Sequence, residues 1–277
     1  MKIEAYAKVN LTLEVLGLRA DGYHAIRSVL LPISLSDTIE ITPAANLTSD
    51  TGYADDLCLK AAKVLCAAVG RRDLGAAIHV IKRIPVGGGL GGGSADAAAV
   101  LRALNDLWQC GFSREQLVQL AAQVGSDVPA LVMGGAVLME GRGEIVTKIE
   151  EPKSINFVLL SPNIGCSTKK VYENCKFRVT NDPKIVYNIR QAISKGDPNL
   201  IAQAMMNDLQ EAAVGLVPEV GAALTALEEA GVARPQMSGS GSTVFGLVPN
   251  ETRGCEIAAF LTAKGFRAWA VHACPVM

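Results

Sequence analysis

Aromatic residues are scarce in this 277-residue sequence and neither sign of charge dominates, since aromatics make up 5% and the formal net charge is −1. Without a basic excess, the chain has no electrostatic basis for binding a nucleic acid or an anionic membrane surface. Long apolar runs are also missing. The best uncharged run, 128–139, has twelve residues, whereas a membrane-spanning helix needs about 20. We therefore expect neither a nucleic acid nor a membrane as a partner.

Paired cysteines are lacking as well. The seven cysteines are odd in number and form no C-x-x-C pair, so we expect neither a disulfide framework nor a cysteine metal site. We expect the cysteines to be small apolar core residues of a protein in a reducing compartment. The first residues include Lys2, Glu4 and Lys8 and no secretory apolar segment, which agrees with a cytoplasmic location. We expect no metal bound by the protein itself and no prosthetic group.

Apolar residues, in contrast, make up 49% of the chain and charged residues 19%, which is typical of a compact fold. Alternating apolar residues predict strands at 3–15, 28–35, 38–42, 77–84, 136–140, 145–149, 155–161 and 267–273, with Ser36 and Asp37 forming a turn between the second and third. Apolar spacing of three and four predicts helices at 56–69, from Ser94 to Gly111, from Ser113 to Gly125, and at 184–195, 199–213, 218–230 and 253–264.

Strands and helices mix without strict alternation, so the predicted fold class is α+β rather than a doubly wound parallel sheet. A new strand begins after 151–153. We place a domain boundary there, between an N-terminal domain of residues 1–150 and a C-terminal domain of residues 151–277.

The segment Gly87–Gly93 is the strongest local feature, because six of its seven residues are glycine. Backbone N–H groups without side chains can close around a phosphate, and the helix that follows directs its positive end to the same place. Ser94 is expected to cap this helix and to offer its hydroxyl to a phosphate or a bound metal. A flexible surface loop is the alternative, but this loop joins a strand directly to a strong helix.

Other phosphate-binding loops do not fit this segment. The G-x-G-x-x-G pattern is present at Gly87, Gly89 and Gly92. A dinucleotide fold also needs an acidic residue after a second strand about 20 residues further on, whereas here the predicted helix continues past Asp106. A Walker A loop needs Lys followed by Ser or Thr after its last glycine, and Ser94–Ala95 stands there instead. A protein kinase needs H-R-D and D-F-G, and neither occurs.

Three motifs in order instead resemble those of the GHMP kinases (galacto-, homoserine, mevalonate and phosphomevalonate kinases). They are PVGGGLGGGSADAA at 85–98, AYAKVNL at 5–11 and MSGSGSTVF at 237–245. The resemblance implies a fold with an N-terminal domain like ribosomal protein S5 domain 2 and a ferredoxin-like C-terminal domain. ATP would be the co-substrate, accompanied by Mg²⁺, in a cleft between the domains. The residues expected to bind ATP are Pro85, Gly87, Gly88, Gly89, Leu90, Gly91, Gly92, Gly93, Ser94, Ala95, Gly239, Ser240 and Gly241.

Two shorter segments narrow the match within the family. RADGYH at 19–24 and GSDVP at 125–129 resemble members that phosphorylate the 2-hydroxyl of a cytidine diphosphate sugar alcohol, diphosphocytidyl-methylerythritol, in non-mevalonate isoprenoid synthesis. The alternatives are a GHMP kinase for a homoserine- or mevalonate-type alcohol and a non-catalytic nucleotide-binding homologue. Three features depart from the family pattern. Asp56 stands where the family usually has an asparagine near the adenine, and Ser240 stands where a threonine is common. The segment 165–200 matches the family sequences poorly.

By resemblance, Asp127 is the catalytic carboxylate and Lys8 its partner, because phosphoryl transfer depends mainly on positioning and charge stabilisation. The expected substrate-binding residues are Asn10, Tyr23, His24 and Tyr172. Asn10 would hold methylerythritol hydroxyls, His24 would bind the cytosine edge, and Tyr172 would stack on the base. The structural alternatives are a helix cap for Asp127, a solvated strand residue for Lys8, a backbone-satisfied polar residue for Asn10 and a half-buried surface aromatic for Tyr172. We expect His79 and His272 to be structural.

Overall fold

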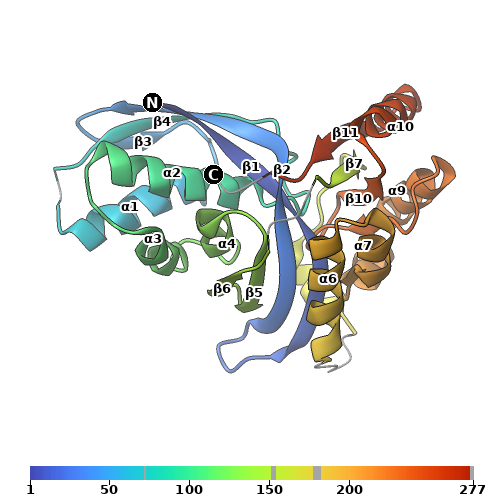
Figure 1. Ribbon diagram of the computed structural model, residues 1–277. Coiled ribbons are helices and arrows are strands. Elements are labelled where there is room, and N and C mark those ends of the chain that lie inside the picture. Colours follow the sequence, from blue (N-terminus) through green and yellow to red (C-terminus); the bar gives the residue numbers. More distant parts are fainter. Residues whose placement is uncertain (72, 151–153, 177–181, 275–277) are drawn as a thin grey trace.

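The computed structural model describes residues 1–71, 73–150, 154–176 and 182–274 and consists of two β-sheets with helices packed against them (Figure 1). The strands of the first sheet are β1 (Lys2–Leu18), β2 (His24–Pro43), β3 (Leu47–Ser49), β4 (Ala76–Ile81), β5 (Val137–Gly141), β6 (Ile145–Lys148) and β8 (Met206–Asn207). β1 and β2 pair in antiparallel fashion along their length. One edge of β2 then pairs with β5 at its beginning and with β4 at its end.

Four helices cover one face of this sheet: α1 (Leu57–Val69), α2 (Gly92–Leu107), α3 (Arg114–Ala121) and α4 (Val128–Met133). α2 lies at the centre, and its small side chains let it approach both the sheet and α1. Ala97 and Ala99 on this helix are fully buried in a core that also contains Ile39, Ile41 and Leu65. Close packing of these small residues fixes the start of α2 relative to the sheet.

The second sheet contains β7 (Asn156–Ser161), β9 (Gln236–Met237), β10 (Val244–Val248) and β11 (Arg267–His272), in the order β11-β7-β10-β9 and antiparallel throughout. The helices of this part of the chain are α5 (Thr168–Asn174), α6 (Pro183–Lys195), α7 (Pro198–Ala204), α8 (Gln210–Leu216), α9 (Pro218–Glu229) and α10 (Glu251–Ala263). If these four strands are numbered in chain order, their order across the sheet is 4-1-3-2. Helices connect the first strand to the second and the third strand to the fourth. This is the ferredoxin-like arrangement that was predicted.

The two sheets are joined through a shared core. Val9 and Leu31 of β1 and β2 lie in one apolar cluster with Phe157 of β7, Phe245 of β10 and Ile189 of α6. β8, from the C-terminal half of the sequence, also pairs in parallel with β1. The predicted domain boundary at 151–153 lies outside the described residues and stays a prediction.

The predicted turn at Ser36 and Asp37 is wrong, because β2 continues through both residues as a single strand. Tertiary contacts stabilise turn-forming residues in the strand here. The Ser36 hydroxyl donates to Glu4 Oε2 at 2.6 Å, and the buried Asp37 carboxylate accepts hydrogen bonds from Lys82 and from the backbone N–H of Ile84. A sequence pattern alone does not contain these distant partners.

The predicted helix 199–213 is also wrong, because it is split into α7, β8 and α8. Asn207, in β8, interrupts the predicted helix. The Asn207 amide donates to the carbonyls of Met237 and Gly239 at 2.8 and 2.9 Å, which holds β8 against β9 and the loop that follows it. The short elements β3, α4 and α5 were not predicted.

The predicted starts of two helices agree with the structure. α1 begins after Asp56, and the predicted capping box of Ser113 and Gln116 is present at the start of α3. All seven cysteines lie in the described part of the chain without a disulfide, four of them buried and Cys255 exposed. Within the described ranges, we find no helix with the length and apolar character needed to cross a membrane.

Candidate active site

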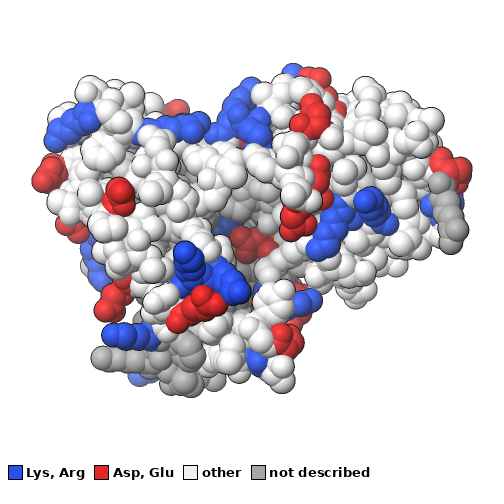
Figure 2. All heavy atoms as spheres, turned by 180° about the vertical axis from the view of Figure 1, so that it is seen from behind, with Lys and Arg blue, Asp and Glu red and all other residues white. Residues whose placement is uncertain are grey.

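A cavity of about 850 Å³ opens beside the glycine-rich loop, β1 and α5. Seen from behind, the molecule is hollowed at its centre, with acidic and basic side chains in and around the hollow (Figure 2). The predicted site residues that line the cavity are Lys8, Asn10, Tyr23, His24, Pro85, Gly87, Gly88, Gly89, Gly91, Gly92, Gly93, Ser94, Asp127, Tyr172, Gly239, Ser240 and Gly241. Leu90 and Ala95 do not line it, because their side chains are buried in the core.

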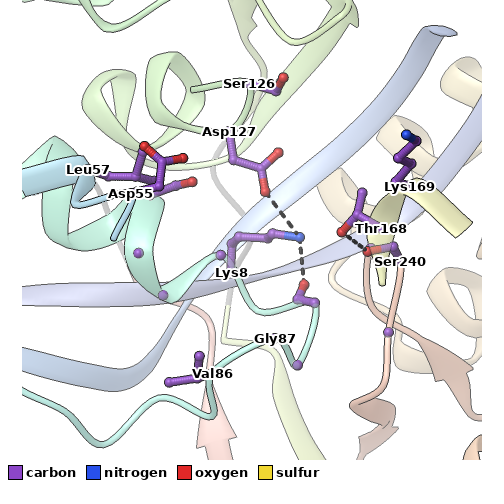
Figure 3. Close-up of a pocket in the computed structure, with 18 of the residues that line it drawn as sticks. Lys8, Asp55, Leu57, Val86, Gly87, Ser126, Asp127, Thr168, Lys169 and Ser240 are labelled. Atoms are coloured by element: carbon purple, nitrogen blue, oxygen red, sulfur yellow. Dashed lines mark hydrogen bonds and ion pairs between the residues drawn. The ribbon is translucent and has the colours of Figure 1, made fainter. Parts of the chain in front are cut away.

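Lys8 on β1 is the buried cation of this cavity, with its side chain 3% exposed and Nζ 3.6 Å from Asp127 Oδ2 (Figure 3). Nζ also donates to Asn10 Oδ1 at 2.5 Å and to the Gly89 carbonyl at 2.7 Å. Burial lowers the pKa of Lys8, and the Asp127 carboxylate opposes that change. Three acceptors therefore face the three protons of the ammonium group, and Lys8 is not a solvated strand residue.

Asp127 stands immediately before α4, a short helix that begins with Val128 and Pro129. It occupies the cap position but makes no side-chain capping hydrogen bond, so its carboxylate is not used to stabilise the helix end. The side chain is 28% exposed and lines the cavity. Proline in the first turn fixes the backbone there, which directs Asp127 toward Lys8.

Asn10 is fixed between Lys8 and Ser28. Ser28 Oγ donates to the Thr12 carbonyl at 2.6 Å and therefore acts as acceptor toward Asn10 Nδ2, at 2.8 Å. This orients the Asn10 amide with Oδ1 toward Lys8. Side chains rather than the backbone thus satisfy the Asn10 amide group.

The glycine-rich loop approaches its neighbours too closely for side chains. A Cβ at Gly89 would overlap the Ser238 carbonyl, and one at Gly91 would lie 3.1 Å from Lys8 Cγ and Cε. Both glycines have positive φ angles, +75° and +68°, which strain other residues. The Ser238 hydroxyl also donates to the Gly89 carbonyl at 3.1 Å, so the C-terminal glycine motif lies against this loop.

The predicted cap at Ser94 is wrong. α2 begins at Gly92 with Gly91 at its cap position, and no side chain caps it. The backbone N–H groups of the first turn are therefore directed to the cavity, which Gly91 to Ser94 line. Such a helix end favours an anion.

Aromatic rings and cations gather at the α5 side of the cavity. The rings of His24 and Tyr172 stack with centroids 5.1 Å apart and planes inclined by 29°. Burial raises the pKa of the Tyr172 phenol, which keeps its hydroxyl protonated. The Arg142 guanidinium lies 5.2 Å from the centre of the Tyr23 ring. The sequence analysis predicted Tyr172 as a residue of this site but did not predict Arg142, and both line the cavity.

The opposite side of the cavity is lined by Thr51, Tyr53, Leu57 and Val86. Asp56, which departs from the family pattern, caps α1 here: Oδ1 accepts from the Leu59 N–H at 3.0 Å and Oδ2 from the Thr51 hydroxyl at 2.5 Å. Both oxygens are thus engaged within the protein. Figure 3 shows Asp55 and Leu57 on this side and Thr168 and Ser240 on the other, with Lys8 and Asp127 between them.

Two further charged residues, Lys82 and Asp96, line the cavity and were missed by sequence reasoning. The available signal was position alone, since they flank the glycine-rich loop. His79 contacts the Asp50 carboxylate at the surface, and neither His79 nor His272 lines the cavity. In the described ranges, no group of three or more His, Cys, Asp or Glu side chains could hold a metal ion.

Two segments of this chain match known family domains, and known proteins match most of its length. Residues 56–135 match the GHMP kinases N terminal domain and residues 189–267 match the GHMP kinases C terminal domain, together more than half of the chain. A protein of Pelotomaculum thermopropionicum, named 4-diphosphocytidyl-2-C-methyl-D-erythritol kinase, is 43% identical over 263 residues, which are 92% of this chain and 91% of that protein. A protein of Geobacillus thermodenitrificans with the same name is 40% identical over 262 residues, 91% and 90% of the two chains.

Solved structures agree with this result. The crystal structure of a 4-(cytidine 5'-diphospho)-2C-methyl-D-erythritol kinase superimposes with a TM-score of 0.83 at 32% identity, covering 99% of this chain and 100% of that one. Homoserine kinase from Cytophaga hutchinsonii shares the fold, with a TM-score of 0.76 at 18% identity over 100% and 95% of the two chains. The predicted α+β fold is confirmed, and the chain belongs to the GHMP kinase family.

Proposed function

We propose that this chain uses ATP to phosphorylate the 2-hydroxyl of 4-diphosphocytidyl-2-C-methyl-D-erythritol, in the non-mevalonate route to isoprenoid precursors. One observation carries the proposal: Lys8 and Asp127, 3.6 Å apart, lie between an anion-binding loop and a stacked aromatic pair in one cavity. The 43% identity with a kinase of that name supports the choice of acceptor.

The two charged groups act on the acceptor hydroxyl. Asp127 accepts a hydrogen bond from this hydroxyl and directs its oxygen toward the γ-phosphoryl group. Lys8 holds Asp127 in place and stabilises negative charge on the transferring group, whose transition state is loose. Because Lys8 Nζ also contacts the Gly89 carbonyl at 2.7 Å, the same cation links the acceptor site to the phosphate loop.

The donor nucleotide lies along the glycine-rich loop. Backbone N–H groups at Gly91–Ser94 surround the terminal phosphates, and the end of α2 adds its partial positive charge. The C-terminal motif, Gly239–Gly241, forms the facing wall. The adenosine then extends toward Leu57 and Val86, which line the apolar side of the cavity.

The cytidine end of the acceptor lies at the α5 side. The His24 and Tyr172 rings already contact each other at a centroid distance of 5.1 Å, which leaves no room for a base between them. In the complex, His24 therefore turns away from the Tyr172 ring, so that the cytosine stacks on that ring and His24 binds a polar edge of the base. Tyr23 completes this wall. Arg142 beside it is a cation within reach of the acceptor's diphosphate.

Magnesium enters with ATP in this proposal. Mg²⁺ is usually held by one or two carboxylates together with substrate phosphates, and the chain offers the Asp127 carboxylate and the Ser94 hydroxyl near the phosphate loop. The ion neutralises phosphate charge, while the residues themselves bind and orient the two substrates. We also propose that the enzyme acts in the cytoplasm, where ATP is available.

The test is transfer of phosphate from ATP to the cytidine diphosphate substrate, with homoserine and mevalonate as control acceptors. We expect turnover of the cytidine compound alone. Asp127→Asn should reduce kcat by about 10²–10⁴-fold, because the hydroxyl loses its charged acceptor, while ATP still binds. Asp106→Asn is a matched control, since Asp106 is exposed on α2. Near wild-type turnover of Asp127→Asn would contradict the assignment.

A further inference from the structure

The C-terminal glycine motif is held in place by a side chain that lies outside the cavity. The Asn207 amide donates to the carbonyls of Met237 and Gly239, at 2.8 and 2.9 Å, and so bridges the residue between them, Ser238. Asn207 Oδ1 accepts from the Leu209 N–H at 2.9 Å. Both amide protons and the amide oxygen are thus engaged with the backbone. Asn207 does not line the cavity and has no contact with either substrate in the proposed mechanism.

The segment that contains Asn207 is fixed to β1. β8 pairs in parallel with β1, and Asp208 adds two hydrogen bonds. Its N–H donates to the Leu13 carbonyl at 3.0 Å, and its Oδ2 accepts from the Val15 N–H at 2.8 Å. β1 is also the strand on which Lys8 lies. Asn207 therefore joins the C-terminal glycine motif to the strand of the cavity's buried cation.

The glycine motif in turn packs on the groups that act in the reaction. Ser238 is fully buried, and its hydroxyl donates to the Gly89 carbonyl at 3.1 Å and accepts from the Asn10 N–H at 3.4 Å. A Cβ at Gly239 would lie 3.0 Å from Lys8 Nζ and 3.0 Å from the Gly89 carbonyl oxygen. A displacement of this backbone would therefore disturb both the glycine-rich loop and the ammonium group beside it.

Two further amide side chains hold the same segment. Gln210, the first residue of α8, accepts from the Met237 N–H through Oε1 at 2.8 Å. Gln236 Nε2 donates to the carbonyls of Asn10 and Leu11, at 3.1 and 3.2 Å. Residues 238–242 consist only of serine and glycine, which restrict the backbone little by themselves. Their position therefore depends on these amide groups.

We propose that Asn207 is a positioning residue for the donor side of the reaction, because it holds Ser238 and Gly239 where they support the glycine-rich loop for the phosphates of ATP. The inference rests on the proposed function. Without the amide, two backbone carbonyls lose their donor, and Ser238 loses its alignment with the Gly89 carbonyl. A misplaced loop weakens ATP binding and slows phosphoryl transfer. The cytidine end of the acceptor, bound at the α5 side, is not affected.

The test compares Asn207→Ala with Asn105→Ala as a matched control. Asn105 also binds the backbone through its side chain, at the Phe112 carbonyl and N–H, both at 3.1 Å, and it does not line the cavity. Thermal unfolding should show a similar loss of stability in both variants. We expect kcat/KM for ATP to fall about 10- to 100-fold in Asn207→Ala alone, while KM for the cytidine substrate stays unchanged. Equal kinetics in the two variants, or an equal rise in both KM values, would overturn the inference.

A double-mutant cycle with Ser238→Ala tests whether Asn207 acts through Ser238. Asn207→Ala should change kcat/KM for ATP much less in the Ser238→Ala background than in the wild type. Additive effects of the two substitutions would contradict the inference. Gln210→Ala, which removes only the acceptor of the Met237 N–H, is a milder variant in case Asn207→Ala does not fold. It should lower kcat/KM for ATP as well, and unchanged kinetics would contradict the inference.

Calorimetry with ATP and Mg²⁺ separates this inference from the proposed function. We expect Asn207→Ala to bind ATP about tenfold or more weakly than the wild type, and Asn105→Ala to bind it as the wild type does. Equal affinities in all three proteins would overturn the inference and leave the proposed function intact. If the wild type bound ATP but did not phosphorylate the cytidine compound, the proposed acceptor would be wrong, and weaker binding by Asn207→Ala would still support the positioning role.

Discussion

Ser28 determines which way the Asn10 amide faces, and through it the environment of Lys8. The serine hydroxyl is committed as donor to the Thr12 carbonyl and as acceptor from Asn10 Nδ2. Asn10 Oδ1 therefore faces the Lys8 ammonium at 2.5 Å. Since burial lowers the pKa of Lys8, each remaining acceptor matters for keeping it charged.

We predict that Ser28→Ala shifts the alkaline limb of the kcat profile to lower pH. In the proposed mechanism turnover needs charged Lys8, so activity should fall as the pH rises through the pKa of Lys8, which lies below its usual 10.5. Without Ser28, the Asn10 amide can rotate and turn Nδ2 toward Lys8. Losing an acceptor to a charged group, worth about 1.5–3 kcal/mol, corresponds to roughly one to two pH units. The measurement is kcat against pH at saturating substrates.

Ser36→Ala provides the control for Ser28→Ala. Ser36 lies on the same strand and its hydroxyl donates to Glu4 Oε2 at 2.6 Å, away from the cavity. Its profile should coincide with that of the wild type. If Ser28→Ala lowers kcat equally at every pH, the serine stabilises the strand without acting through Lys8.

We predict that His24→Ala raises KM for the cytidine substrate far more than KM for ATP. Removing one partner leaves a polar edge of the base unsatisfied, which costs about 1–3 kcal/mol or roughly 5- to 150-fold in affinity. The effect should appear in KM if the contact is equally strong in ground and transition states. His272→Ala, at an exposed position on β11, is the control. An unchanged KM for the cytidine substrate would remove His24 from the acceptor site.

At the level of elements, the glycine-rich loop depends on close contact between backbone and side chains. We predict that Gly91→Ala reduces turnover by at least tenfold, because the new Cβ lies 3.1 Å from Lys8 Cγ and Cε and 3.5 Å from Asp127 Oδ2. Its positive φ of +68° adds strain of about 1–2 kcal/mol. Steady-state kinetics together with thermal unfolding separate the two effects.

Gly111→Ala is the matched control for that strain. Gly111 has a φ of +73°, and nothing lies within 4 Å of its added Cβ. It should lose a similar amount of stability while turnover is retained. If both variants lost stability and kept turnover, the contact of Gly91 with Lys8 would not matter for catalysis.

The elements that sequence predicts well are those with a strong local pattern. α1 and α3 begin at side-chain caps, and the strands β5, β6, β7 and β11 each have a glycine or a turn residue near one of their ends. The elements that it misses depend on distant partners. β2 passes through Asp37 because Lys82 and the Ile84 N–H donate to its carboxylate, and α5 is too short to show a period.

The same distinction applies to the candidate site. Lys8 and Asp127 were predicted as site residues because each lies in a family motif, and the structure places Lys8 Nζ 3.6 Å from Asp127 Oδ2. Ser28, Asp37 and Lys82 lie in no motif. They become visible only after β1 pairs with β2 and β2 pairs with β4, which no short segment of sequence specifies.

At the level of the whole molecule, the two sheets are not independent units. Phe157 and Phe245 of the second sheet are fully buried, with ring centroids 5.8 Å apart in an edge-to-face contact. They belong to one apolar cluster with Val9 and Leu31 of the first sheet. Interfaces between mobile domains are usually smaller and more polar. A shared apolar core favours a single cooperative transition.

We predict that Phe157→Ala destabilises both sheets together, by about 3–5 kcal/mol. The two tryptophans allow a direct measurement, since Trp108 packs on the N-terminal core and Trp269 on the shared one. In Trp269→Phe, the remaining Trp108 reports on the first sheet and its helices. In Trp108→Phe, the remaining Trp269 reports on the second sheet. Denaturant curves from both should coincide and shift equally when Phe157→Ala is added. If the Trp269 signal moved alone, the halves would unfold separately and the shared core would contribute little to their coupling.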